Sequence, residues 1–411
     1  MANDKEQLKY WVWLQTVLGY ECTRFESAIK QFKTAKDIYL ADRTLLEASK
    51  IFTPKQISKI KETPLSVADS VLFDCENNGI KILPFDHTDY PDALRNIPSP
   101  PIVVYVLGEL PKVDNIPVIC VVGPRKPSDY GVKAAFSLSY RLAVGGFTIV
   151  SGGALGIDTC AHSGALACGA KTIAVLGSGI LDNYLMKNAD IRKTISENGC
   201  LISEFQPRFA ATRFSFPMRN RIMSGIADAV VVVEAKLKSG SIITADCALE
   251  QGKDVYVIPG SPGNPNCEGS NKLIKDGAIT LINADQIFCD YGSAGAYPNI
   301  IDEGKAFNEQ VNKDIKIAYK AFESDFYGAP IVTDKKPKTQ ESEPIKINTP
   351  DLSELSDLAK EVLSVISDDV FILEQINLEN VSYGELSLII TQLEMAGIVE
   401  AIPGGRYRKL I

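Results

Sequence analysis

The stretch from Val118 to Cys168 decides the fold: VICVVGPRKPSDYGVKAAFSLSYRLAVGGFTIVSGGALGIDTCAHSGALAC. It holds two apolar runs of strand length, 118–122 and 147–150, and each is followed by a glycine-containing loop and a helix-like segment. Continuous apolar strands that alternate with helices are typical of a parallel sheet covered on both faces. The pattern predicts a doubly wound α/β domain, and ligands of such domains bind beyond the carboxyl ends of the strands.

The two loops that follow these strands suit an anionic ligand. Gly152, Gly153 and Gly156 allow positive φ and a close approach of the backbone, and N–H groups at a helix start attract negative charge. Arg125 adds a planar guanidinium that can hold a phosphate through two hydrogen bonds. The glycine spacing matches neither a dinucleotide fingerprint nor a P-loop, so tight turns beside a solvated arginine remain an alternative.

The composition is that of a globular protein with two or three domains, since 45% of the 411 residues are hydrophobic. The net charge of -8 argues against a generally basic surface for nucleic acids but allows a local basic patch. Nine scattered cysteines without a C-x-x-C pair predict reduced thiols and no zinc site. No secretory segment or membrane-spanning run is found, so we expect a cytoplasmic protein without a membrane partner.

Apolar periodicity divides the chain into four parts. The expected parts are a small helical (SAM-like) domain at 1–65, an extended Rossmann-like domain at 66–290, a linker at 291–350 and a winged-helix domain at 351–411. Charged residues, Gly and Pro accumulate in the linker, where one helix is expected around 315–322. The winged helix is indicated by helical stripes followed by a hairpin pattern.

The segment 205–227 contains no acidic residue, although the protein as a whole is acidic. Its arginines and phenylalanines are interleaved, as Phe205, Arg208, Phe209, Arg213, Phe214, Phe216, Arg219 and Arg221. Arginines follow a phosphate backbone and aromatic rings stack on unpaired bases, so an exposed face of both types favours binding of single-stranded nucleic acid. The alternative is that the rings belong to the core and the arginines form a solvated face.

Support for catalysis is thin. There are two histidines, of which His87 lies in a charged turn and His162 is expected to be a satisfied structural residue. Glu204 and Asp158 are candidates for an acid–base pair, but their separation in sequence does not determine their distance. We therefore predict no catalytic residue, no metal and no cofactor.

At these residues the chain resembles the DNA-processing protein A family, also called Smf. The matching residues are Gly123, Arg125, Ser128, Tyr130-Gly131, Ser151-Gly152-Gly153-Ala154, Gly156-Ile157-Asp158, Ala161-His162, Val175-Leu176-Gly177, Gly179, Ile202-Ser203-Glu204, Phe216-Pro217-Met218-Arg219-Asn220-Arg221-Ile222, Val233-Glu234-Ala235, Ser239-Gly240-Ser241, Thr244-Ala245, Pro259-Gly260, Gly269, Asn271, Leu273-Ile274 and Gly277-Ala278. They span the whole α/β domain. Two positions depart from the family: Pro124 replaces a small residue and removes one loop N–H, and Leu185 stands where proline is usual.

The resemblance implies a non-enzymatic protein that binds single-stranded DNA on the Rossmann-like domain and dimerises through it. Such a protein protects incoming DNA and loads the recombinase RecA onto it during natural transformation and homologous recombination. The resemblance also implies the DNA-binding residues, which are Arg125, Lys126, Ser128, Gly152, Gly153, Gly156, Arg213, Phe214, Phe216, Arg219, Asn220 and Arg221. Among them Arg125 holds phosphate, Arg213 with a neighbouring ring grips backbone and base, and the last three support the pocket.

Two other classes of function stay open. A nucleotide-binding or nucleotide-hydrolysing Rossmann-like enzyme would use Glu204 or Glu234 as an acid, and it would release base or sugar phosphate from nucleoside monophosphates. A structural adaptor would bind neither ligand. The expected recognition helix at 383–396 has no Lys or Arg, which favours a regulatory or partner-binding role for the winged helix over duplex binding.

Overall fold

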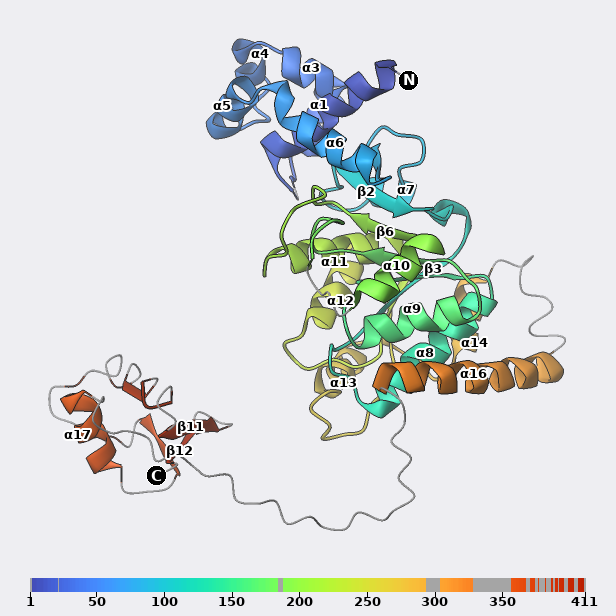
Figure 1. Ribbon diagram of the computed structural model, residues 1–411, viewed down its shortest axis with the longest axis vertical. Coiled ribbons are helices and arrows are strands. Elements are labelled where there is room, and N and C mark those ends of the chain that lie inside the picture. The colour runs from blue at the N-terminus through green and yellow to red at the C-terminus, as the bar shows by residue number, and fades with distance from the viewer. Residues whose placement is uncertain are drawn as a thin grey trace. The chain divides into compact units, whose positions relative to one another are not determined.

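The computed structural model describes residues 2–20, 22–183, 188–292 and 304–327, together with parts of the segment 356–409. The chain forms two compact units, Met1–Pro330 and Ile331–Ile411 (Figure 1). The first unit is built on a nine-stranded sheet of order β1-β2-β6-β5-β4-β3-β7-β8-β9. The predicted α/β architecture, with a helical region at its amino-terminal end, is thereby confirmed.

The strands of the large sheet are short and mostly buried. They are β1 (Lys81–Pro84), β2 (Val103–Gly108), β3 (Val118–Val122), β4 (Thr148–Ser151), β5 (Thr172–Val175), β6 (Cys200–Ser203), β7 (Ala229–Val232), β8 (Asp254–Val257) and β9 (Ile279–Thr280). The seven neighbouring strands β6, β5, β4, β3, β7, β8 and β9 pair in parallel. Strands β1 and β2 pair antiparallel and form one edge of the sheet. The chain runs outward from β3 to β6 and then returns to β7 on the other side of β3, so the topological switch point lies between β3 and β7.

Helices cover both faces of this sheet. One face carries α8 (Asp129–Val144), α9 (Ile157–Ala167), α14 (Ala284–Tyr291) and α16 (Gly304–Tyr327), and the other carries α11 (Ser215–Ile226) and α12 (Gly240–Glu250). Alternate residues of β3 serve the two cores, since Cys120 packs with α11 and α12 while Ile119 and Val121 pack with α8 and α9. The shorter helices α7 (Asp92–Arg95), α10 (Ala189–Glu197) and α13 (Glu268–Lys275) complete the layers.

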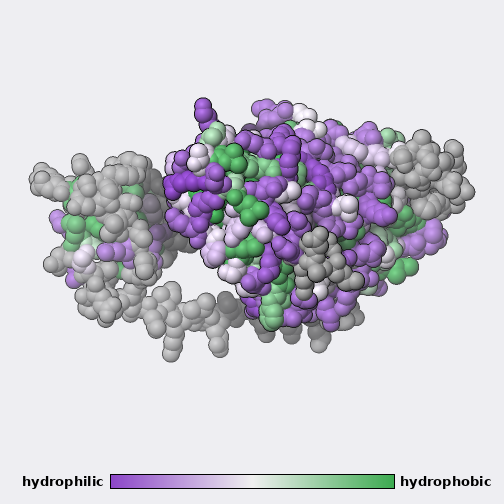
Figure 2. All heavy atoms as spheres, turned by 90° about the horizontal axis from the view of Figure 1, so that it is seen from above, coloured by the Kyte–Doolittle hydropathy of each residue, from purple (hydrophilic) through white to green (hydrophobic). Residues whose placement is uncertain are grey.

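The amino-terminal helices form a cluster on the β1–β2 side of the sheet. They are α1 (Ala2–Leu18), α2 (Phe25–Phe32), α3 (Ala35–Leu40), α4 (Arg43–Ala48), α5 (Pro54–Glu62) and α6 (Asp69–Asn77). The buried Gln15 side chain joins α1 to the sheet, because its amide donates to the carbonyls of Val103 (3.3 Å) and Glu204 (3.0 Å). Seen from this end, the surface is mainly hydrophilic with small hydrophobic patches (Figure 2), as Trp11 and Trp13 are turned inward.

Helix α16 lies within the stretch expected to be a linker. A helix was expected around 315–322, and the structure extends it to Gly304–Tyr327. It packs across α8 (Figure 1). At this contact the rings of Phe136 and Phe322 stack with centroids 4.9 Å apart. In the described part of the chain, no helix combines the length and the apolar character needed to cross a membrane.

The second unit contains α17 (Asp357–Val365) and a small antiparallel sheet of β10 (Val370–Ile372), β12 (Arg406–Lys409) and β11 (Val399–Ile402). Strands β11 and β12 pair antiparallel with Ile402 opposite Arg406, which agrees with the hairpin pattern in the sequence. Most of the expected recognition helix at 383–396 lies outside the described residues, and so does Leu185. The complete winged helix therefore stays a prediction.

Candidate functional site

A crevice of about 320 Å³ lies at the carboxyl ends of β3 and β7. Its wall contains Arg125 from the loop after β3, Phe216 and Asn220 from α11, and Lys236 and Lys238 from the loop after β7. In doubly wound sheets ligands bind at the switch point, because the loops of the two adjacent strands diverge there. The sheet order therefore puts a crevice where the two glycine-containing loops predicted one.

The two loops are packed tightly against each other. Gly156 has φ +82°, and a side chain at this position would collide with the carbonyl of Pro124. That carbonyl also accepts a hydrogen bond from the backbone of Ile157 at 3.2 Å. Gly153 has φ +63°, and a side chain at Gly152 would collide with the guanidinium of Arg219. The predicted glycines are thus required by the packing of the protein itself.

The amino terminus of α8 already carries a negative group. Ser128 is its N-cap and accepts a hydrogen bond from the backbone of Gly131 at 3.1 Å. The buried carboxylate of Glu234 accepts hydrogen bonds from both the backbone N–H (3.0 Å) and the hydroxyl of Ser128. Negative charge is stabilising at this end of a helix. Ser128 therefore fixes the end of the loop, and Glu234 is held inside the protein.

Arg219 lies beneath the second loop. Its Nη1 donates to the carbonyls of Gly152 (2.8 Å) and Val175 (2.5 Å). Burial lowers the pKa of Arg219, whereas the charge of Asp158 opposes that change. Burial likewise raises the pKa of Asp158, and Arg219 opposes the rise. This buried pair of charges holds the floor of the crevice.

The next two residues of α11 are also engaged within the protein. The Nη2 atom of Arg221 lies 2.6 Å from both carboxylate oxygens of Glu204, and the two side chains are 6% and 2% exposed. The amide of Asn220 donates to the carbonyl of Gly240 at 3.1 Å, which ties α11 to the start of α12. Arg219, Asn220 and Arg221 are therefore each held by hydrogen bonds within the protein.

Exposed cations and rings gather where α11 begins. The guanidinium carbon of Arg125 lies 5.4 Å from the centre of the Phe216 ring, and that of Arg213 lies 4.7 Å from the Phe214 ring. Phe214 is 64% exposed, and Arg125, Arg213 and the neighbouring Lys126 are exposed as well. These residues come from two distant parts of the sequence, and Arg125 and Phe216 among them line the crevice.

The upstream part of the same segment has a structural role. Phe205 is buried and stacks on Phe209, with ring centroids 4.7 Å apart. Arg208 makes two hydrogen bonds to the carboxylate of Asp74 on α6, at 2.7 and 2.9 Å. The interleaved pattern thus contains the buried Phe205 with an exposed arginine anchored to α6, then exposed residues at Arg213 and Phe214, and finally the buried arginines of α11.

Lys236 and Lys238 were missed by the sequence reasoning. Both are exposed and line the crevice opposite Arg125, and a pair of lysines between a strand end and a helix start was the available signal. They precede Ser239, the N-cap of α12, whose hydroxyl oxygen is buried and has no hydrogen-bond partner in the described part of the chain. The loop after β7 therefore adds two cations and a helix amino terminus to the crevice.

His162 is fully buried, as expected for a structural residue, but it is only partly satisfied because its Nε2 has no hydrogen-bond partner in the described part of the chain. Its Nδ1 lies 2.8 Å from the hydroxyl of Thr172. Burial, together with the charge of Arg219, lowers the pKa of His162 to about 3. Among the described residues, no group of His, Cys, Asp and Glu side chains could hold a metal ion.

The low pKa of His162 leads to a testable prediction. The imidazole of the unfolded chain takes up a proton near pH 6.5, whereas that of the folded protein does so only near pH 3. The stabilisation that the neutral imidazole gives to the folded protein is therefore complete above pH 6.5 and is lost as the pH falls toward 3. The NMR signal of the His162 imidazole is identified as the one that disappears in His162→Gln. We expect this signal in the wild type to show no titration between pH 8 and about pH 5. An inflection near pH 6.5 would contradict the buried, neutral imidazole.

Known proteins match the chain across this site. The sequence profile of the family described as DNA recombination-mediator protein A matches residues 81–292, which run from β1 to the end of α14. Protein Smf of Synechocystis sp. is 32% identical over 418 residues, and the alignment covers 100% of both chains. The X-ray structure of DNA processing protein A from Streptococcus pneumoniae matches with a TM-score of 0.61 and 29% identity, over 69% of this chain and 98% of that one. A structure of the Helicobacter pylori DNA processing protein A, described for its single-stranded DNA binding mode, matches with a TM-score of 0.47 and 30% identity, over 51% of this chain and 94% of that one.

Proposed function

We propose, because the chain belongs to the DNA recombination-mediator protein A family, that it binds single-stranded DNA in the crevice between β3 and β7. The observation that carries the proposal is the pair of cation–ring contacts where α11 begins: Arg125 with the half-buried Phe216 in the crevice wall, and Arg213 with the exposed Phe214. Cations that follow a backbone and rings that accept unpaired bases are the two elements of single-strand binding.

Each part of the crevice has a role in this proposal. Arg125, Lys236 and Lys238 contact phosphates, and the first turn of α12 offers backbone N–H groups to the same charges. Phe214 and Phe216 stack on bases, and each such contact contributes about 1–3 kcal/mol. The arginines of α11 do not touch DNA in this proposal, since both are buried and donate inside the protein, Arg219 to backbone carbonyls and Arg221 to Glu204.

Family membership supports a wider role. We extend the proposal to a homodimer that protects incoming single strands and loads the recombinase RecA onto them in transformation and recombination. The helical domain at 1–65 and the start of the Rossmann-like domain at 66 keep the bounds expected from the sequence, whereas helix α16 joins the Rossmann-like domain because it packs on α8. The winged helix at 351–411 has a regulatory or partner-binding role. Its candidate recognition helix lacks the positive charge that duplex binding requires.

We propose no catalytic step, because the three candidate carboxylates already have partners inside the protein. Glu204 binds Arg221, Glu234 binds Ser128, and Asp158 is buried beside Arg219. A nucleotide-hydrolysing enzyme would need one of these groups to be free to act on its substrate, but Asp158, the one that lines the crevice, accepts a hydrogen bond from the backbone of Ala154 at 3.3 Å. Their engagement therefore favours binding over hydrolysis.

Fluorescence anisotropy of a labelled oligo-dT with the full-length chain tests the proposed function. We expect tight binding that weakens roughly tenfold or more between about 50 and about 200 mM salt, because three or more phosphates exchange counterions for protein cations. Unlabelled duplex should compete weakly. Absence of binding at low salt would contradict the proposal. Release of base or sugar phosphate from nucleoside monophosphates would then identify the chain as an enzyme. A chain that neither binds DNA nor releases these products would be a structural adaptor.

A further inference from the structure

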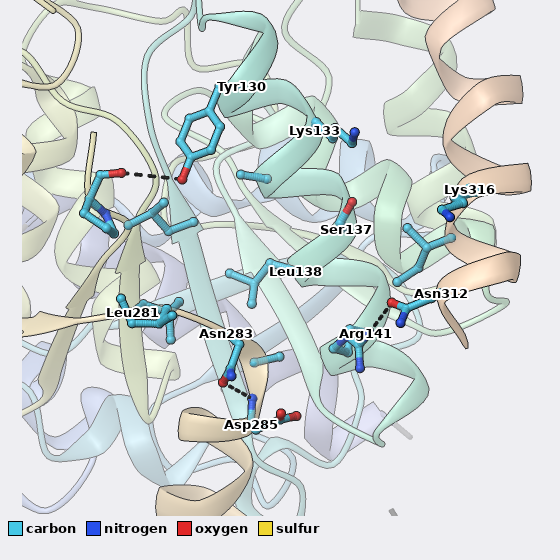
Figure 3. A pocket seen from close by; sticks show the side chains of 16 residues that line it. Tyr130, Lys133, Ser137, Leu138, Arg141, Leu281, Asn283, Asp285, Asn312 and Lys316 are labelled. Carbon is cyan, nitrogen blue, oxygen red and sulfur yellow. Dashed lines mark hydrogen bonds between the residues drawn. The ribbon is translucent and has the colours of Figure 1, made fainter. Parts of the chain in front are cut away.

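A second and larger groove, of about 860 Å³, begins where the first loop of the crevice ends (Figure 3). It lies between α8, the segments that follow β8 and β9, and helix α16. Ser128 ends the loop that carries Arg125, and Tyr130, two residues further on, is the first residue of α8 that lines the groove. The crevice and the groove are therefore consecutive along the chain.

Helix α16 builds one wall of the groove and gives it positive charge. Its apolar residues recur at helical spacing and pack into the core beneath α8; they are Val311, Ile315, Tyr319, Phe322 and Phe326. Lys313, Lys316 and Lys320 are exposed on the side of α16 that does not enter this core. Of the three, Lys316 lines the groove. A hydrogen bond of 2.5 Å from Arg141 on α8 to Asn312 on α16 closes the base of this wall (Figure 3).

The lining has the chemistry of a single-strand track. Lys133, Arg141 and Lys316 contribute three positive charges against one acidic lining residue, Asp285, although the protein carries a net charge of -8. The ring of Tyr130 is 55% exposed, with its hydroxyl 3.5 Å from the carbonyl of Pro259. Ile282, which is 74% exposed, adds an apolar surface. Cations beside exposed flat or apolar groups suit a strand whose phosphates and bases alternate.

We propose that single-stranded DNA bound in the crevice continues along this groove, where Tyr130 stacks on a base and Lys133 and Lys316 contact phosphates. This inference rests on the proposed function, and it makes the length of the strand matter. A short strand fills the crevice alone, whereas a longer one occupies both surfaces. An acidic peptide could meet the same cations, but continuity with the crevice favours a nucleic acid.

The test compares two oligonucleotide lengths on full-length variants. Lys133→Gln combined with Lys316→Gln removes two exposed charges from the groove. Lys55→Gln combined with Lys59→Gln is the matched control, because these lysines lie on α5, in the cluster that packs at the opposite edge of the sheet. Labelled oligo-dT of about 6 and about 30 nucleotides is titrated by anisotropy, since sites of this class span from a few to over a dozen nucleotides.

We expect the groove variant to bind the short oligonucleotide like the wild type and the long one about tenfold more weakly, with a smaller salt dependence. The control should bind both like the wild type. Tyr130→Ala should weaken the long complex about fivefold, whereas Tyr130→Phe, which keeps the ring, should not. Equal binding of the short strand also shows that each variant is folded.

One result would overturn the inference and leave the crevice intact, namely a groove variant that binds the long oligonucleotide as tightly as the wild type does. If polyglutamate also bound the wild type and not that variant, the groove would be a site for an acidic peptide. Failure of the proposed function looks different, because the wild type would then bind neither oligonucleotide.

Discussion

Replacing Arg125 with alanine is expected to weaken the binding of single-stranded DNA by about ten- to a hundredfold. The guanidinium is exposed at the mouth of the crevice, and its contact with Phe216 orients it there. Hydrogen bonds to a charged group contribute about 1.5–3 kcal/mol, which corresponds to this loss of affinity. The measurement is anisotropy of labelled oligo-dT at low salt, with the thermal stability of the variant unchanged because the side chain is exposed.

Two further variants separate the possible reasons for such a loss. Arg125→Lys keeps the charge and removes the planar fork, so its affinity should lie between those of the wild type and the alanine variant. Arg208→Ala removes an arginine of the same basic segment that is bound to Asp74, and it should leave affinity unchanged. If Arg125→Ala bound as tightly as the wild type, the strand would have to lie elsewhere on the protein.

The position of the crevice could be predicted because buried parallel strands have a clear sequence signature. The runs at 118–122 and 147–150 have little polar character, and β3 and β4 are buried throughout. Loops at the carboxyl ends of such strands meet at one edge of the sheet. Arg125 was therefore predictable as a crevice residue from its place in the first loop.

The split within the basic segment was not predictable, because it depends on contacts between distant residues. Arg213 and Arg221 have similar neighbours in sequence, but one is exposed while the other meets Glu204 from the end of β6. Lys236 and Lys238 are likewise brought to Arg125 by the return of the chain to β7 beside β3. Sequence spacing contains no information about that strand order.

Helix α16 illustrates the same difficulty from the other side. Its many charges suggested a linker, and only a helix around 315–322 was expected. The apolar residues at helical spacing become decisive once Phe136 on α8 is available to Phe322. A tertiary partner thus stabilises a helix whose composition is typical of solvent-exposed chain.

Arg221→Ala is expected to be the most destabilising single change considered for this site, with a loss of about 3–5 kcal/mol in the free energy of unfolding. The Glu204 carboxylate is 2% exposed and faces the Arg221 guanidinium, so the substitution removes a bound cation from a buried carboxylate. The backbone carbonyl of Glu204 also accepts a hydrogen bond from Gln15. The buried carboxylate therefore lies where α1 joins the sheet. Circular dichroism should record a melting temperature lower by several degrees.

A double variant tests whether the buried Glu204 charge causes the loss of stability. Glu204→Gln combined with Arg221→Met removes both charges, and it should recover most of the lost stability because a buried ion pair replaced by neutral groups is often tolerated. At a temperature where Arg221→Ala is still folded, its affinity for oligo-dT should stay close to that of the wild type, since the side chain supports the crevice from below. A melting temperature unchanged in the single variant, or DNA binding lost while it is folded, would contradict this supporting role.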